Sequence, residues 1–255
     1  MEKGNNKVIM KQYYTLLKRI LSKIKNIVCK PSTSKEKIIE PAMPVKKPEP
    51  EEYSTIVGKG YVIPCQIEAY FLALNKYIHD GDKVLDVGFG LGYGLNIMAI
   101  KANEVYGVDV DKKVYDYCNE TIVGRNPRLV MLDIYNGYDL PFEDNKFDVV
   151  TCVDVLEHVR DYHRLVNEML RVCKNGVFVS TPNRRPEYTN LDGTPKNVWH
   201  IREWSKDELN DILVTHGDVE WNFLNGPFEG PFSISENLLD NSLTLTPFIK
   251  KTNAK

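Results

Sequence analysis

The chain has 255 residues, a formal net charge of −2 and a hydrophobic fraction of 42%, which fits one globular domain with an appendage. No apolar run reaches the length of a bilayer-spanning helix, and we expect no secretory leader. The five cysteines form no CxxC pair. We therefore expect neither a disulfide framework nor a metal site, and a cytoplasmic location.

Charge is divided unevenly along the chain. Residues 1–52 carry 12 Lys/Arg and 6 Asp/Glu, whereas the remaining residues carry 21 Lys/Arg and 29 Asp/Glu. An acidic domain is poorly suited to collecting phosphate backbones, which argues against a nucleic-acid partner.

The N-terminal arm has its own pattern. Apolar residues recur at helical spacing over residues 7–30, with lysines on the other face, and predict a basic amphipathic helix within residues 1–30. Residues 31–52 are rich in Pro, Lys and Glu and indicate a linker, so the main domain is expected over residues 53–255. The helix either lies peripherally on an anionic membrane surface or packs against protein.

Helices and strands alternate after the linker. The expected order is helix 66–78, strand 83–88, helix 93–102, strand 104–110, helix 112–123, strands 128–134 and 146–155, helix 161–173, strand 176–182, helix 205–217, and closing strands 218–224 and 242–251. This alternation predicts an α/β, Rossmann-like doubly wound sheet of seven strands, mostly parallel, with an antiparallel C-terminal strand. Ligands of such sheets bind at the edge where the parallel strands end.

A glycine-rich loop follows the first strand in "KVLDVGFGLGYGLN", residues 83–96. The dinucleotide fingerprint fails in both registers, because Tyr93 or Leu95 stands at the third glycine position, and no Gly-Lys-Ser/Thr completes a P-loop. The acidic Asp86 would repel a pyrophosphate and attract a cation. These features favour S-adenosylmethionine, which carries a sulfonium and no phosphate.

The segment "VLDVGFGLG" resembles the first motif of the class I S-adenosylmethionine-dependent methyltransferases. Later segments, "GVDVD", "LDIYNGYDLPFEDNKFDVV", "CVDVLEHV" and "GVFVSTPN", follow in that family's order. The resemblance implies that Asp109 binds the ribose hydroxyls, although Asp109 and Asp111 both compete to cap the helix near Lys112. It also implies that Asp133 contacts the adenine. The full set of expected cofactor contacts is Asp86, Gly88, Phe89, Gly90, Gly92, Asp109, Val110, Asp133, Ile134, Val153 and Asp154.

The acceptor side is expected around two histidines. His158 follows the fourth strand, and a structural role is an alternative to catalysis there. His200 lies in the long segment between residues 181 and 209, where it either binds the acceptor, acts as a general base, or is purely structural. Candidate acceptor contacts are Tyr61, Arg184, Arg185 and Arg202, the arginines suiting an acidic group unless they are ordinary solvated side chains.

The expected activity is methyl transfer to a small molecule, with an oxygen of a sugar or lipid-linked glycan intermediate as the favoured acceptor. The segments "GKGYVIP" and "STPNRRPE … NVWHIREWSKDEL" resemble methyltransferases of surface-glycan synthesis and, more loosely, of quinone synthesis. Two alternatives remain open: an RNA or protein methyltransferase that uses the basic arm, and a non-catalytic cofactor-binding scaffold.

Overall fold

The computed structural model of the protein describes residues 64–123, 128–228 and 230–252. The predicted arm 1–30, linker 31–52 and acceptor contact Tyr61 lie outside the described residues. The domain organisation therefore stays a prediction. Within the described part of the chain, no helix is both long enough and apolar enough to cross a membrane.

A parallel sheet forms the centre of the described domain. Strand β1 (Lys83–Val87) lies between β2 (Glu104–Asp109) and β4 (Phe147–Val153), while β3 (Leu129–Ile134) and β5 (Cys173–Pro182) lie outside these two. The chain thus builds outward from β1 to β3 and then crosses back to β4. Strand order reverses between β1 and β4, and this is the position where open α/β sheets bind ligands.

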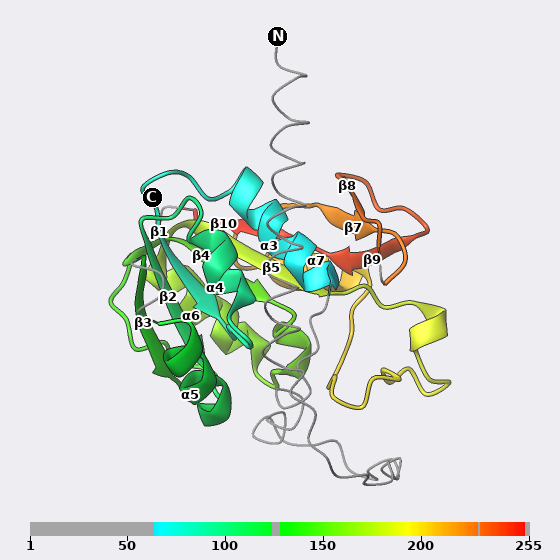
Figure 1. Ribbon diagram of the computed structural model, residues 1–255. Coiled ribbons are helices and arrows are strands. Elements are labelled where there is room, and N and C mark those ends of the chain that lie inside the picture. The colour runs from blue at the N-terminus through cyan, green and yellow to red at the C-terminus, as the bar shows by residue number, and fades with distance from the viewer. Residues whose placement is uncertain (1–63, 124–127, 229, 253–255) are drawn as a thin grey trace, which may run out of the picture. The chain divides into compact units, whose positions relative to one another are not determined.

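Antiparallel strands complete the sheet beyond β5 (Figure 1). Strand β10 (Phe248–Lys250) runs antiparallel to both β5 and β6 (Asp218–Glu220). Three short strands, β9 (Ser242–Leu245), β7 (Phe223–Asn225) and β8 (Ser233–Ser235), continue antiparallel past the end of β5. The predicted fold class is confirmed.

The described domain has ten strands where seven were expected, because each predicted closing strand is split and β8 is added. The splits lie at Asn222 and Pro247. Thr246 N donates to Asn222 O at 2.9 Å, and Val179 N donates to Pro247 O at 3.0 Å. Proline has no N–H to donate to a ladder, which fits a strand boundary at that residue.

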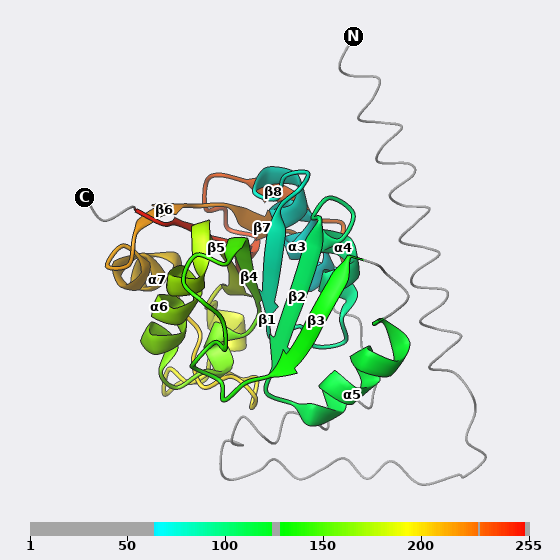
Figure 2. The same cartoon turned by 90° about the vertical axis from the view of Figure 1, so that its left-hand side faces the viewer.

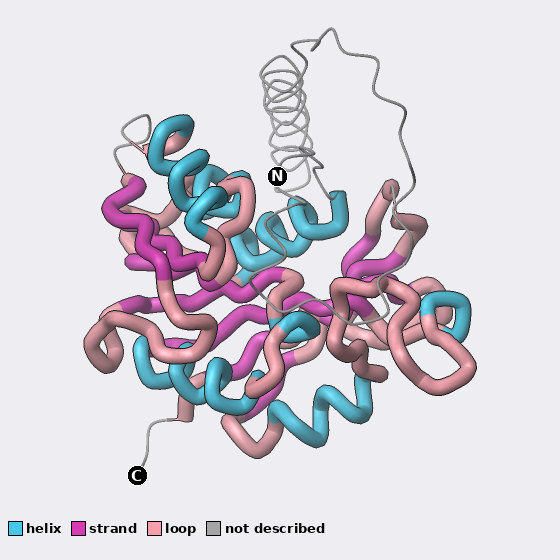
Figure 3. Tube along the Cα trace, turned by 90° about the horizontal axis from the view of Figure 1, so that it is seen from below, coloured by secondary structure: helices cyan, strands magenta, loops and turns pink. Residues whose placement is uncertain are grey.

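Helices cover both faces of the sheet (Figures 2 and 3). Helices α3 (Pro64–Lys76), α4 (Tyr93–Met98) and α5 (Lys112–Thr121) lie on one side, and α6 (Tyr162–Val172) and α7 (Lys206–Leu213) lie on the other. With helices on both sides, the central strands bury both of their faces and read as near-continuous apolar runs.

Local sequence sets where these helices begin. Asp161 caps α6 by accepting from Arg164 N, and Ser205 and Glu208 form a reciprocal capping box at the start of α7. The buried faces of α6 and α7 join the sheet core, whose largest fully buried side chains are Phe147, Phe178, Phe223, Ile78, Leu85, Leu95, Met98, Leu156, Leu165, Met169, Leu209 and Leu213. This core fixes the strand ends that carry the site.

Candidate active site

The glycine loop after β1 needs residues without a side chain. Gly88, Gly90 and Gly92 have φ values of +76°, +51° and +74°, a region that strains other residues. A Cβ at Gly88 would lie 2.4 Å from Val155 Cγ2, whereas a Cβ at Gly90 would meet nothing within 4 Å. At Gly88 the loop therefore lies in close contact with Val155 of the segment after β4. Gly90 borders open space, which a ligand could occupy close to the backbone.

Asp109 lies against this loop from the end of β2. Its Oδ2 accepts from Gly90 N at 3.0 Å and its Oδ1 accepts from Asp111 N at 3.0 Å. Asp111, not Asp109, caps α5 by accepting from Lys113 N. The competition between the two acids for the cap is thus resolved, and Asp109 lies beside the glycine loop; its contact with the ribose stays a prediction.

Asp86 is buried beneath the loop and does not line its surface. Thr151 Oγ1 donates to Asp86 Oδ1 at 2.7 Å, and Tyr70 OH donates to Oδ2 at 3.0 Å. Burial raises the pKa of Asp86 to about 7, although the two hydroxyl donors favour the charged form. The carboxylate of Asp86 therefore has no surface through which it could contact a bound cation directly. It can interact with such a cation only electrostatically, through the protein interior.

The other expected cofactor contacts fall into two groups. Phe89 and Val153 are buried in the core, so only their backbones reach the sheet edge. Val110 and Ile134 are exposed, and Asp133 Oδ1 accepts from Ile134 N at 2.8 Å. Val110 follows β2, and Asp133 and Ile134 end β3, at the same sheet edge as the glycine loop.

A cavity of about 350 Å³ opens beside the loop, beyond the ends of β4 and β5. Asp154 stands at its base with φ +52°, a strained value for a residue other than glycine, and accepts a short hydrogen bond from Ser180 Oγ. The other lining residues come from α3, η2 (Leu156–His158), the segment after β5 and the β7–β9 region: Cys65, Gln66, Glu157, His158, Pro182, Asn183, Tyr188, Lys196, Asn197, Trp199, His200, Glu203, Phe228, Leu243 and Thr244.

The two predicted histidines meet in this cavity although they are 42 positions apart. Their ring centroids lie 4.9 Å apart in an edge-to-face arrangement. His158 Nδ1 lies 2.9 Å from Trp199 O, and His200 Nδ1 lies 2.6 Å from Glu203 Oε1. Burial lowers the pKa of His158 to about 4, so its imidazole is neutral at physiological pH.

The three arginines expected on the acceptor side do not line the cavity. Arg184 pairs with Glu208 at 2.7 Å, and Arg185 pairs with Glu187. The guanidinium of Arg202 lies over the ring of Tyr162, 4.6 Å from its centroid. Each arginine thus already contacts the protein itself, and their role in acceptor binding stays a prediction.

Several cavity residues were not singled out from the sequence. Glu157 had a usable signal, since it adjoins His158 directly after a predicted buried strand. Trp199 and Tyr188 lie in the long segment that was expected to face the acceptor, but irregular backbone gives no periodicity that would orient a side chain. Phe228 and Leu243 come from the C-terminal region, where no sequence motif indicated a site.

Comparison with known proteins connects this site to a family. A family model described as a methyltransferase domain matches residues 85–181. A probable S-adenosylmethionine-dependent methyltransferase of Mycobacterium tuberculosis (strain H37Rv) is 32% identical over 186 residues, which is 69% of this chain and 65% of that protein. A ubiquinone biosynthesis O-methyltransferase of Alkalilimnicola ehrlichii is 32% identical over 175 residues, covering 64% of this chain and 70% of the relative.

The chain belongs to the S-adenosylmethionine-dependent methyltransferase family. The crystal structure of the YcgJ protein of Bacillus subtilis shares the fold of this chain, with a TM-score of 0.58, 18% identity, and coverage of 73% of this chain and 99% of that one. The chain spans only 65% of the length of its mycobacterial relative.

S-adenosylmethionine is the cofactor of this family, and the glycine loop fits it. A Cβ at Gly90 would meet nothing within 4 Å, and the carboxylate of Asp109, which accepts from Gly90 N, lies beside it. The role of these two residues in cofactor binding stays a prediction. The loop has neither the third glycine of a dinucleotide-binding loop nor the Gly-Lys-Ser/Thr of a P-loop. Val155 lies against Gly88 and directly follows Asp154, which lines the cavity.

Proposed function

We propose that this methyltransferase transfers a methyl group to an oxygen of a small-molecule acceptor, and that the acceptor is a sugar or a lipid-linked glycan intermediate. The observation that supports the proposal is the cavity containing His158 and His200, which lies beyond the ends of β4 and β5 and is lined by Asp154, the neighbour of the Val155 that lies against Gly88. A cavity of about 350 Å³ is at the small end of ligand sites, which suits a single ring better than a macromolecule.

One group of residues is proposed to bind the cofactor, and another to bind the acceptor. When bound, S-adenosylmethionine supplies a methyl group on a positively charged sulfur. Asp109 and the backbone around Gly90 hold that side, while the cavity walls orient the acceptor oxygen and exclude water. An acceptor hydroxyl must also lose its proton, and we expect an imidazole of the cavity, from His158 or His200, to accept it.

The lining of the cavity supports a sugar ring. Asn183 and Asn197 supply amide groups that bind hydroxyls, and Tyr188 and Trp199 supply aromatic faces on which a ring can lie. The same aromatic lining supports a second candidate, a phenolic hydroxyl, which is the acceptor type suggested by the name of the Alkalilimnicola relative. The remaining alternatives are an RNA or protein acceptor reached through the basic arm, and a cofactor-binding scaffold without activity.

An acceptor screen with labelled cofactor tests the proposal. The full chain is incubated with sugar nucleotides, lipid-linked sugars, simple phenols and RNA, and the labelled product is identified. Label in a sugar supports the favoured acceptor; label in a phenol or RNA replaces it, and no label in any class favours the scaffold.

Matched variants assign the site in the same assay. His200→Ala should lower kcat/KM at least about 100-fold, while calorimetric affinity for the cofactor stays within about twofold. His163→Ala is the control, because His163 contacts His216 on the protein surface and does not line the cavity. Asp109→Ala should instead weaken cofactor binding at least about tenfold. Unchanged affinity there would contradict the cofactor side of the assignment.

A further inference from the structure

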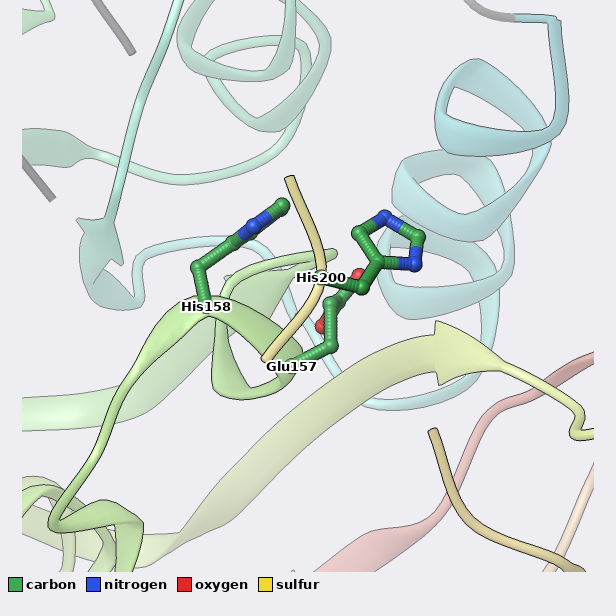
Figure 4. A group of neighbouring side chains, drawn as sticks. All are labelled: Glu157, His158 and His200. Atoms are coloured by element: carbon green, nitrogen blue, oxygen red, sulfur yellow. The ribbon is translucent and has the colours of Figure 1, made fainter. Parts of the chain in front are cut away.

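Three side chains in the cavity form a cluster that methyl transfer by itself does not require. Glu157 and His158 come from η2, and His200 comes from the segment between η3 (Pro186–Tyr188) and α7. One nitrogen or oxygen atom from each lies within 4.8 Å of the other two. Figure 4 shows the three side chains gathered at the end of η2. Two imidazoles and a carboxylate are a donor set that first-row transition metals prefer.

The carboxylate of Glu157 is incompletely satisfied. The side chain is fully buried, and its Oε2 accepts from Thr181 Oγ1 at 3.1 Å. Its Oε1 has no hydrogen-bond partner within the described part of the chain. A buried carboxylate oxygen without a donor or cation is costly. A cation beside Oε1 would remove this cost.

Both histidines are oriented as metal-binding histidines usually are. His158 Nδ1 lies against the backbone carbonyl of Trp199 at 2.9 Å, and His200 Nδ1 lies against the carboxylate of Glu203 at 2.6 Å. In metal sites such contacts fix the proton on one nitrogen and direct the other nitrogen at the ion. In the structure His200 Nε2 also lies 2.9 Å from Asn197 Nδ2, an amide that a bound ion would displace.

We infer that Glu157, His158 and His200 bind a divalent first-row transition-metal ion such as Zn²⁺. The remaining coordination positions of the ion face the cavity. Its use in catalysis, though not its binding, rests on the proposed function: the ion would bind the acceptor hydroxyl and lower its pKa. With the ion bound, the two imidazoles would act as its ligands and would not accept the proton. The hydroxyl proton would then leave to water, and the oxygen–carbon bond would form as the carbon–sulfur bond of the sulfonium breaks.

The sequence argued against such a site because it lacks paired cysteines. The ligands inferred here are instead an adjacent Glu-His pair and a histidine 42 positions later, a spacing that matches no short metal motif. Only the fold brings them together, because β4 and β5 are neighbours and each delivers the segment that follows it to the same edge.

Metal binding by the full chain tests the inference without any acceptor. The protein is stripped with a chelator and titrated with Zn²⁺ by calorimetry, and Co²⁺ is added separately so that its visible absorption reports coordination number. One ion per chain is expected, with a four- or five-coordinate Co²⁺ spectrum. Glu157→Gln and His200→Ala should each weaken binding at least about 100-fold, and Glu203→Gln about 10- to 100-fold.

The surface pair of His163 and His216 provides the matched control. His163 Nδ1 lies 3.1 Å from His216 Nε2, so this pair could hold an adventitious ion. If His163→Ala abolishes binding while Glu157→Gln leaves it intact, the ion belongs to the surface and the inference is overturned. Absence of binding at micromolar Zn²⁺ also overturns it.

Cofactor affinity and circular dichroism check that each variant is folded. If a variant fails that check, the wild-type Co²⁺ spectrum decides, since an octahedral spectrum without nitrogen ligation contradicts the site. A chain that binds zinc but methylates nothing in the acceptor screen retains the site and loses the proposed function.

Discussion

Asp86 should make the stability of the cofactor-free protein fall as pH rises through neutrality. Its pKa is raised from 3.8 to about 7 by burial. Because the folded state then binds a proton more tightly than the unfolded state, this contribution is fully present below pH 4 and is lost as pH rises through 7. The perturbation that isolates it is Asp86→Asn, which keeps the shape of the protonated side chain and removes the titration.

The magnitude follows from the proton count. Between pH 6 and pH 8 the folded protein holds on average about half a proton more at Asp86 than the unfolded chain does. At about 1.36 kcal/mol per pH unit for one proton, the free energy of unfolding of the wild type falls by about 1.4 kcal/mol over this range relative to the variant. In a domain of this size that corresponds to roughly 3–5 °C in Tm.

Urea unfolding of both proteins at pH 6, 7 and 8, without cofactor, provides the measurement. The other buried acids, Asp109 among them, are present in both proteins and cancel in the difference. The variant loses one acceptor for Thr151 or Tyr70, which shifts its stability by a constant and leaves the pH slope unchanged. A wild-type-minus-variant difference that is flat from pH 6 to pH 8 would refute the reasoning, because Asp86 would then be ionised throughout.

Three further outcomes test the loop and the sheet edge. Gly88→Ala should cost about 3 kcal/mol in urea unfolding, because its Cβ would lie 2.4 Å from Val155 Cγ2 at φ +76°. Gly90→Ala should cost only about 1 kcal/mol but weaken calorimetric cofactor binding, since its Cβ enters open space; equal costs would contradict this contrast. Lys76, with smaller effects from Lys250 and Tyr77, lowers the pKa of Glu220 to about 2, a contribution to stability that is lost as pH falls from about 4.5 to about 2. Lys76→Met should therefore raise the midpoint of acid unfolding by about 0.5 pH unit, and an unchanged midpoint would contradict that role.

The sheet was predictable because its signals are local. The strands β1, β2, β4 and β5 are largely buried and read as apolar runs, and α5, α6 and α7 each begin at a capping side chain. The C-terminal strands were predicted in the right region, but their division into shorter strands was not predicted. Their boundaries depend on hydrogen bonds between distant segments, such as the one from Val179 N to Pro247 O. Such contacts leave no periodic trace in the sequence.

The candidate site was predictable in part, for the same physical reason. The cofactor side was predicted from strand ends, from the glycine spacing at Gly88 and Gly90, and, for Asp109, from the resemblance to the family; these assignments stay predictions. Asp86 was expected to face a cation and lies instead beneath the loop, because Thr151 and Tyr70 supply its hydrogen bonds from β4 and α3. A sequence shows that an acid ends a strand, but not which hydroxyl groups enclose it.

The acceptor side depends on how an irregular segment is tied to the sheet. Ile201 N donates to Glu157 O at 2.9 Å, and Arg184 N donates to Trp204 O at 2.8 Å. These hydrogen bonds hold the segment carrying His200 against residues that follow β4 and β5. Glu157 therefore holds this segment with its backbone while its side chain belongs to the cavity. Tyr188 and Trp199 lie between these hydrogen-bonded residues, and their side chains can be substituted without breaking the two backbone hydrogen bonds. We expect acceptor specificity to reside in that segment and the chemistry to reside in Glu157 and the two histidines.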